Sequence, residues 1–303
     1  MKYEIDGELA RLAKQKAPAN LYLYPFVNIV MKNSCRSDDK VTVCKYTAPG
    51  YKGQKLSTLV IEPKQYTGEL PCIVFYHGGG FLLKASKAHY QIAKWYAEKA
   101  QCKVVFPDYR LLPKYRYPVA AEDCYSAYRW AADNAETLHI NKEKIIVAGD
   151  SAGANLAAAV ALMLRDRNHT PPMGALLIYP VVDRRMMTDS MKKYTDTPVW
   201  DAKLTDMFWK AYLKGQDPEK MEYASPMEAK SFKHFSKTYI EVAEFDCLHD
   251  EGVAFAEKLQ SEGISTELHE VKGACHGFEV ALESTIVQDS INRRMKWIRT
   301  VFQ

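Results

Sequence analysis

From residue 56 onward, the chain alternates short apolar segments with longer segments that carry apolar residues at helical spacing. The short segments are rich in β-branched and aromatic residues, and most are apolar throughout, as expected of strands that are covered on both faces. This alternation predicts an α/β protein with a mostly parallel sheet and helices on both faces. The predicted strands are residues 56–61, 72–76, 103–106, 144–148, 175–179, 238–243 and 266–271.

The segments between these strands predict helices, because small and apolar residues recur there at intervals of three and four. The segment after residue 150 is rich in Ala and Leu, which favour helix formation. The predicted helices are residues 88–100, 119–134, 151–165 and 251–262, with a last helix that contains Ile291, Met295, Ile298 and Phe302.

Two segments depart from the alternation. Residues 1–45 predict one or two short helices, and residues 184–225 are rich in Met, Trp and Tyr without a clear strand. We expect both to form a helical cap over one end of the sheet. Because no repeat or long linker interrupts the sequence, we expect one domain over residues 1–303. Aromatic residues of the cap that are candidates for lining a pocket are Tyr22, Tyr24, Phe26, Trp200, Phe208, Trp209 and Tyr212.

Composition and charge exclude several classes of protein. Hydrophobic residues make up 47% of the chain, which is too many for a disordered protein. The net charge is only +4 and no basic run is concentrated, so we expect no nucleic-acid partner. No apolar run reaches about 18 residues and the N-terminus does not resemble a signal peptide, so we expect neither membrane insertion nor secretion.

The cysteines give no sign of a metal site or a disulfide framework. There are seven of them, they are scattered, and none forms a Cys-x-x-Cys pair. An odd number of scattered cysteines favours reduced thiols, which are typical of a reducing compartment. We therefore expect a cytoplasmic protein without a bound metal.

Residues 149–153 have the sequence Gly-Asp-Ser-Ala-Gly and lie between a predicted strand and the Ala-rich predicted helix. A Gly-x-Ser-x-Gly in this context is typical of a nucleophile elbow, a turn so tight that the flanking positions must be glycine. Ser151 would then lie at a helix N-terminus, where free amides and the helix dipole favour developing negative charge. The pattern predicts Ser151 as a nucleophile.

Three consecutive glycines, residues 78–80, follow the second predicted strand. Glycine lets backbone amides approach a ligand closely, and in esterases such a loop donates hydrogen bonds to the oxyanion together with the residue after the nucleophile. This predicts Gly78, Gly79 and Ala152 as oxyanion donors; the alternative is a flexible turn. No Gly-x-Gly-x-x-Gly or Gly-Lys-Ser/Thr pattern is present, so we expect no nucleotide cofactor.

A nucleophilic serine needs a base, which follows the serine and the acid in this fold. His276 lies in a glycine-containing turn directly after the last predicted strand, and sites of this kind assemble at the carboxyl ends of parallel strands. His276 is therefore the predicted base. The other histidines downstream of Ser151 are less well placed: His169, His234, His249 and His269.

Two aspartates follow the predicted strand 238–243 and could supply the acid. Asp246 is closest to the end of the strand, whereas Asp250 is better explained as a residue at the start of the next helix. We therefore predict Asp246 as the acid. Asp150 precedes the nucleophile directly, and its side chain must point away from Ser151.

These motifs and their order resemble the hormone-sensitive-lipase-like family of α/β-hydrolase esterases. The resemblance covers about residues 55–300 and implies an α/β-hydrolase fold, a cap built partly from the N-terminus, and hydrolysis of carboxylic esters without a cofactor. It rests on HGGGF at 77–81, DYRLLP at 108–113, PVAAED at 118–123, GDSAG at 149–153, SP at 225–226, DCLHDEG at 246–252 and HGF at 276–278.

Taken together, the motifs predict a serine carboxylesterase that hydrolyses short-chain acyl or acetyl esters through an acyl-enzyme. We expect a small-molecule ester as its partner, and an edge strand near the C-terminus could pair two chains into a homodimer. One alternative is an amidase or deacetylase with the same triad. Another is a non-catalytic receptor of the same fold, although plant hormone receptors of the family lack the histidine that is present here as His276.

Overall fold

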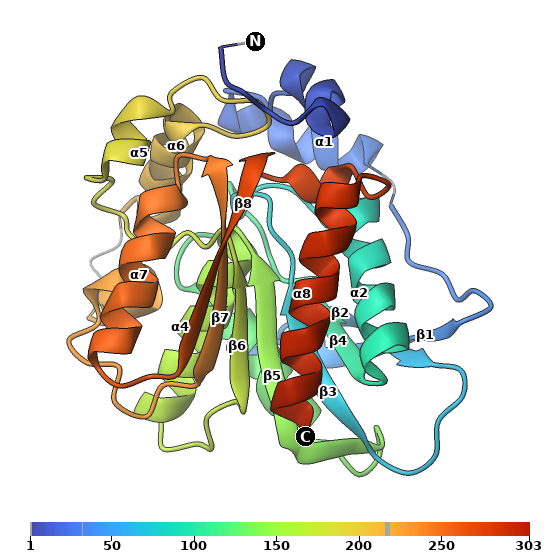
Figure 1. Cartoon of the computed structure of the whole chain (residues 1–303). Coiled ribbons are helices and arrows are strands. Elements are labelled where there is room, and N and C mark those ends of the chain that lie inside the picture. The colour runs from blue at the N-terminus through green and yellow to red at the C-terminus, as the bar shows by residue number, and fades with distance from the viewer. Residues whose placement is uncertain (1, 32, 216–218) are drawn as a thin grey trace.

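The computed structural model of the chain describes residues 2–31, 33–215 and 219–303, and its centre is an eight-stranded sheet (Figure 1). The strand order is β1-β2-β4-β3-β5-β6-β7-β8, in which β2 is antiparallel to both its neighbours and the pairs from β4 to β8 are parallel. The strands are β1 (Val41–Pro49), β2 (Lys55–Pro63), β3 (Leu70–Tyr76), β4 (Lys103–Pro107), β5 (Ile140–Asp150), β6 (Gly174–Ile178), β7 (Lys237–Phe245) and β8 (Thr266–Cys275).

Helices cover both faces of the sheet because its central strands are apolar on both sides. Neighbouring strand residues point to opposite faces, so Ile73 and Ile146 belong to one buried cluster while Val74 and Val147 belong to the other. Helices α2 (Lys87–Ala100) and α8 (Thr285–Phe302) pack on the first face. The second face is covered by α3 (Val119–Asp133), α4 (Ala152–Asp166) and α7 (His249–Ser261).

The predicted α/β-hydrolase fold and each predicted strand are confirmed, but one strand was not predicted. Residues 41–45, which we assigned to the helical cap, belong to β1 and pair with β2, for example Val43 with Ile61. β1 lies at the edge of the sheet and is only partly buried, so its sequence lacks the apolar run of the central strands.

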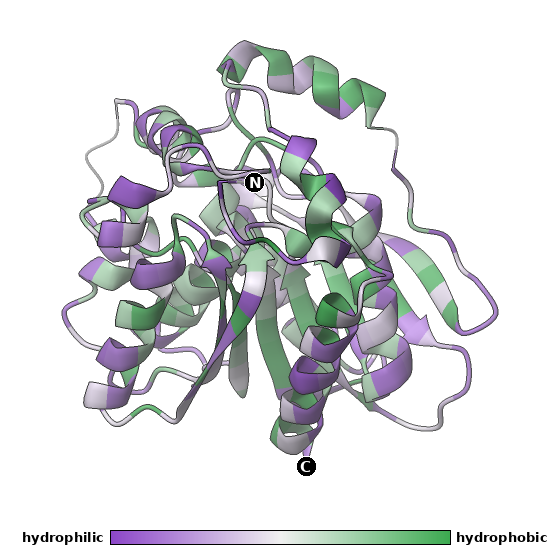
Figure 2. Ribbon diagram, turned by 45° about the horizontal axis from the view of Figure 1, so that its top comes forward, coloured by the Kyte–Doolittle hydropathy of each residue, from purple (hydrophilic) through white to green (hydrophobic). Residues whose placement is uncertain are grey.

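The cap lies over the carboxyl ends of the strands, as Figure 1 shows. Its N-terminal and internal parts are joined by a short parallel bridge, in which Val199 donates to the carbonyl of Gln15 at 2.7 Å and Ala17 donates to the carbonyl of Val199 at 3.2 Å. In Figure 2, α1 stands out at the edge of the cap as a largely hydrophobic helix. The helices of the cap are η1 (Gly7–Lys14), η2 (Leu21–Leu23), α1 (Tyr24–Val30), α5 (Asp189–Lys193) and α6 (Ala202–Tyr212).

Short 3-10 turns complete the described chain: η3 (Tyr51–Gly53), η4 (Met221–Tyr223), η5 (Pro226–Glu228) and η6 (Phe278–Val280). None of the helices within residues 2–31, 33–215 and 219–303 has the length and hydropathy that crossing a bilayer requires.

Candidate active site

Ser151 occupies the turn between β5 and α4 in a conformation that few non-glycine residues adopt. Its φ is 55° and its ψ is −120°, and α4 begins at the next residue. The turn is so tight that a side chain at Gly153 would collide with the backbone of Tyr76 in β3, and one at Gly149 would collide with Gly153. The predicted glycine requirement therefore has a direct steric cause.

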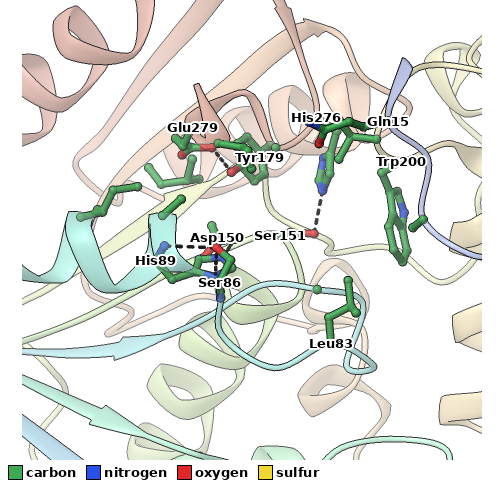
Figure 3. Close-up of a pocket in the computed structure, with 18 of the residues that line it drawn as sticks. Gln15, Leu83, Ser86, His89, Asp150, Ser151, Tyr179, Trp200, His276 and Glu279 are labelled. Carbon is green, nitrogen blue, oxygen red and sulfur yellow. Dashed lines mark hydrogen bonds and ion pairs between the residues drawn. The ribbon is translucent and has the colours of Figure 1, made fainter. Parts of the chain in front are cut away.

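A chain of hydrogen bonds joins Ser151, His276 and Asp246, and Figure 3 shows its first contact, between Ser151 and His276. Ser151 Oγ lies 2.9 Å from His276 Nε2, and His276 Nδ1 lies 2.6 Å from Asp246 Oδ2. The carboxylate can only accept, so it fixes the proton on Nδ1 and leaves Nε2 free to accept from the serine hydroxyl. The structure thus brings together the three residues that the sequence predicted as a triad.

Strand pairing explains why Asp246 and His276 meet. Phe245 in β7 is paired with Cys275 in β8, so the residues that follow them leave the sheet side by side. Asp246 is 0% exposed and also accepts a hydrogen bond from the amide of Leu248 at 3.0 Å, which holds its carboxylate in place.

The surroundings of His276 favour its protonated form. Burial alone would lower the pKa of His276, but the carboxylate of Asp246 outweighs that effect and raises it above the usual value. The centroids of two aromatic rings, those of Tyr179 and Trp200, lie 4.6 Å and 6.2 Å from the centroid of the imidazole, and these rings limit its movement.

The other residues considered for the acid and the base make contacts away from Ser151. Asp250 is in the first turn of α7, where its carboxylate contacts His249 at 2.8 Å and accepts from the amide of Ser190 at 2.7 Å. His169 contacts Arg129, and His269 stacks on Tyr239 within the sheet region.

One of the predicted oxyanion donors is not available. The amide of Gly78 donates to Asp150 Oδ1 at 3.0 Å, so the prediction for Gly78 needs correction. The amides of Gly79 and Gly80 have no hydrogen-bond acceptor among the described residues, and both glycines have a positive φ, of 113° and 63°. Two amides are therefore free in this loop, and they belong to the second and third glycine rather than to the first and second.

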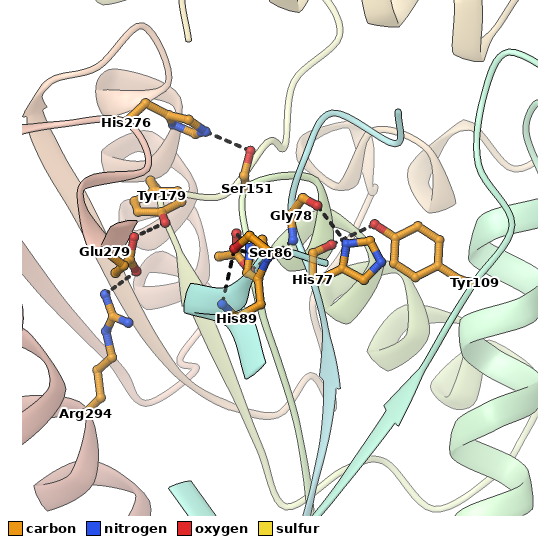
Figure 4. Close-up of polar contacts among 11 residues, drawn as sticks. His77, Gly78, Ser86, His89, Tyr109, Ser151, Tyr179, His276, Glu279 and Arg294 are labelled. Atoms are coloured by element: carbon orange, nitrogen blue, oxygen red, sulfur yellow. Dashed lines mark hydrogen bonds and ion pairs between the residues drawn. The ribbon is translucent and has the colours of Figure 1, made fainter. Parts of the chain in front are cut away.

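A further residue, His89, was missed by the sequence analysis. Its Nε2 donates to Asp150 Oδ2 at 3.0 Å (Figure 3), and its Nδ1 accepts from the amide of Ser86 at 2.8 Å (Figure 4). Burial alone would raise the pKa of Asp150, but His89 and the amide of Gly78 outweigh it and hold this carboxyl below its usual pKa. Asp150 therefore ties the nucleophile turn to the glycine loop on one side and to α2 on the other.

The glycine loop is also held by Tyr109, which contacts His77, the residue before the first glycine. The ring of Tyr109 stacks on His77 with their centroids 4.5 Å apart, and its hydroxyl donates to the carbonyl of His77 at 2.6 Å. Together with the bond from Gly78 to Asp150, these contacts fix the start of the segment that carries the free amides.

Ser151 and His276 line a cavity of about 340 Å³. Its wall is formed by cap residues such as Val27 and Trp200 and by sheet and α2 residues behind the serine. Of the aromatic residues proposed for the pocket, Trp200 alone lines the cavity among the described residues. Tyr22 and Phe26 are 74% and 69% exposed, and the others pack the cap onto the core: Tyr24, Phe208, Trp209 and Tyr212.

No group of side chains in the described part of the chain has a composition and spacing that could hold a metal ion. The seven cysteines include none in a disulfide; Cys35 and Cys44 are partly buried and the other five are buried.

The sequence profile of the α/β hydrolase fold family matches residues 73–280. The chain belongs to this family. Among its relatives, carboxylesterase NlhH of Mycobacterium tuberculosis is 34% identical over 233 residues, which are 76% of this chain and 73% of the relative. The arylesterase of Saccharolobus solfataricus is 33% identical over 207 residues, which are 68% of this chain and 67% of the relative.

Solved structures of esterases resemble this chain over almost its whole length. A bacterial heroin esterase superposes with a TM-score of 0.90 at 28% identity, covering 99% of this chain and 98% of that one. Esterase LipW from Mycobacterium marinum superposes with a TM-score of 0.91 at 29% identity, covering 99% and 96%. These relatives place the protein among the hormone-sensitive-lipase-like esterases, and it is a carboxylic ester hydrolase.

We predict that His89→Leu lowers kcat for ester hydrolysis by roughly tenfold or more, because Asp150 loses a donor and the glycine loop is held less firmly. His89→Gln keeps an N–H donor for Asp150 and should retain most of the activity. His269→Leu, in β8 away from the cavity, is the matched control. Steady-state kinetics with 4-nitrophenyl butyrate measure all three, and an unchanged kcat in His89→Leu contradicts the role of this contact.

Proposed function

We propose that the protein hydrolyses short-chain carboxylic esters of small molecules through an acyl-enzyme formed on Ser151. The observation that carries the proposal is the continuous chain from Ser151 Oγ through His276 to Asp246, with distances of 2.9 Å and 2.6 Å, at the wall of a cavity. Nucleophile, base and orienting acid are then each within reach of the next, as nucleophilic catalysis requires.

In the first half of the reaction, Ser151 Oγ attacks the ester carbonyl carbon while His276 Nε2 takes the hydroxyl proton. Asp246 accepts the Nδ1 hydrogen bond throughout and stabilises the imidazolium that forms. The negative charge of the tetrahedral intermediate develops on the former carbonyl oxygen. We assign its stabilisation to the amides of Gly79, Gly80 and Ala152, the last of which lies at the N-terminus of α4.

His276 then gives its proton to the leaving alcohol as the carbon–oxygen bond of the ester breaks. Water enters, His276 takes a proton from it, and the resulting hydroxide attacks the acyl-enzyme carbonyl. The second tetrahedral intermediate collapses with return of the proton to Ser151 Oγ, which releases the carboxylic acid and restores the enzyme.

Ser151→Ala should reduce hydrolysis of 4-nitrophenyl acetate by at least about a thousandfold, because the remaining groups cannot form the acyl-enzyme. Ser261→Ala, at the end of α7, is a serine variant outside the cavity and should behave as wild type. Release of 4-nitrophenol measures activity, and thermal unfolding verifies that both variants fold. Hydrolysis by Ser151→Ala at the wild-type rate would refute Ser151 as the nucleophile.

Acyl length provides a second test. A cavity of about 340 Å³ must hold parts of both the acid and the alcohol, and Trp200 and Tyr179 stand close to the reacting atoms. We predict that kcat/KM is highest for acyl chains of about two to six carbons and falls steeply toward laurate. A series of 4-nitrophenyl esters from acetate to laurate measures this, and a maximum at the longest chain would contradict the proposal.

The pH dependence follows from His276. The base must be neutral to accept a proton, and Asp246 raises the pKa of His276. The acidic limb of the kcat/KM profile should therefore lie above the pKa of about 6.5 of a free histidine. Asp246→Asn removes the carboxylate, so the limb should move to lower pH while kcat falls by about a thousandfold or more. An acidic limb that stays at the same pH in Asp246→Asn would contradict the claim that this aspartate raises the pKa of the base.

A further inference from the structure

The cavity continues behind Ser151 along one face of α2. His89, Ile92 and Tyr96 line it and are separated by about one turn each, so its wall follows this helix for two turns, or about 10 Å. In Figure 3, His89 and Asp150 lie on one side of this inner part, and Tyr179 and Glu279 lie on the other. The inner part is thus a defined chamber with polar groups at its end.

Two neighbouring hydrogen-bond donors at the inner end have no partner of good geometry among the described residues. They are the hydroxyl of Tyr96, which is 0% exposed, and Nε of Arg294, which is 1% exposed. Both residues line the cavity that contains Ser151. A buried donor without an acceptor is costly. An oxygen atom of a bound molecule could accept from both groups.

The charges around the chamber argue against an anionic ligand. Arg294 is shared by two carboxylates, with Nη2 at 2.5 Å from Glu241 and 2.8 Å from Glu279. Asp150 adds a third carboxylate, next to His89. Even with His89 protonated, three carboxylates face two cations. A further buried anion would lack a counter-charge, so the oxygen that fits here is uncharged.

An apolar chain fits the inner end poorly. It would displace any water from Tyr96 and Arg294 without replacing the hydrogen bonds, and a site with buried polar groups discriminates strongly against such a ligand. The wall before this point is apolar, with Phe75, Ile92 and Ile178 among its residues. The chamber therefore suits a group with an apolar stem and a single polar atom near its far end.

We infer that the inner end of the cavity is a subsite for an uncharged hydrogen-bond-accepting oxygen, such as a keto oxygen, roughly five or six chain atoms from the ester carbonyl. This inference rests on the proposed function and names the class of ester that the same site prefers. Either the acid or the alcohol of the ester could carry the oxygen, and the experiment distinguishes the two.

The test compares two matched pairs of esters by titration of the released acid. Ethyl 5-oxohexanoate and ethyl hexanoate differ only in the acid, whereas 4-oxopentyl acetate and pentyl acetate differ only in the alcohol. In one pair, kcat/KM should be about tenfold higher for the oxo ester, and that pair identifies the half that enters the chamber. No preference for the oxo ester in either pair would overturn the inference.

A charged comparison tests the second part of the inference. Monoethyl glutarate has a carboxylate near the position of the keto oxygen of ethyl 5-oxohexanoate, and 3-carboxypropyl acetate has one near that of 4-oxopentyl acetate on the alcohol side. In the half of the ester that shows the oxo preference, three esters are compared: the oxo, the apolar and the charged one. The charged ester should be the poorest substrate of the three. A charged ester that is hydrolysed faster than its oxo counterpart would overturn the claim that the subsite takes an uncharged oxygen.

Tyr96→Phe removes only the hydroxyl and should bring the oxo-to-apolar ratio of kcat/KM close to one. Tyr212→Phe is the matched control, because the hydroxyl of Tyr212 is also buried without a partner but Tyr212 in α6 does not line the cavity. Its ratio should equal that of the wild type. A preserved ratio in Tyr96→Phe would overturn the inference. Failure of the proposed function is distinct, since the wild-type protein would then hydrolyse none of the esters.

Discussion

The turn from β5 to α4 is the constraint on which the rest of the site depends. It holds Ser151 at a positive φ, and the absence of a side chain at Gly153 lets α4 start against the backbone of β3. This close approach brings the glycine loop after β3 beside the N-terminus of α4. The strained residue is therefore also the one whose hydroxyl faces His276, which is typical of backbone strain at functional positions.

Paired charges hold the site together inside an otherwise apolar protein. Asp246 is matched by His276, Asp150 by His89 and the amide of Gly78, and Arg294 by two carboxylates. Such pairs are costly to bury and more costly to break, because one partner would remain charged without compensation. They therefore favour a single arrangement of β5, β7, β8 and α2, which positions the proposed triad before a substrate arrives.

Local patterns carried enough information to predict the central strands and the nucleophile turn, since each depends on residues near in sequence. Asp246 and His276 could be predicted as well, because both directly follow parallel strands, whose carboxyl ends meet at one edge of the sheet. What depended on contacts between distant segments could not be predicted. The edge strand β1 has no apolar run, the role of Gly78 is decided by the carboxylate of Asp150, and His89 becomes visible only once α2 is packed beside β5. Tyr22 likewise belongs to the cap but faces outward.

The central claim is that the contact with His276 activates Ser151 alone among the serines of the chain. Labelling with a fluorophosphonate, followed by mass spectrometry of the digested protein, tests this directly. The account predicts one phosphonyl group on the peptide that contains Ser151, with complete loss of esterase activity at one label per chain. Labelling of another residue, or full activity after Ser151 is modified, would contradict it.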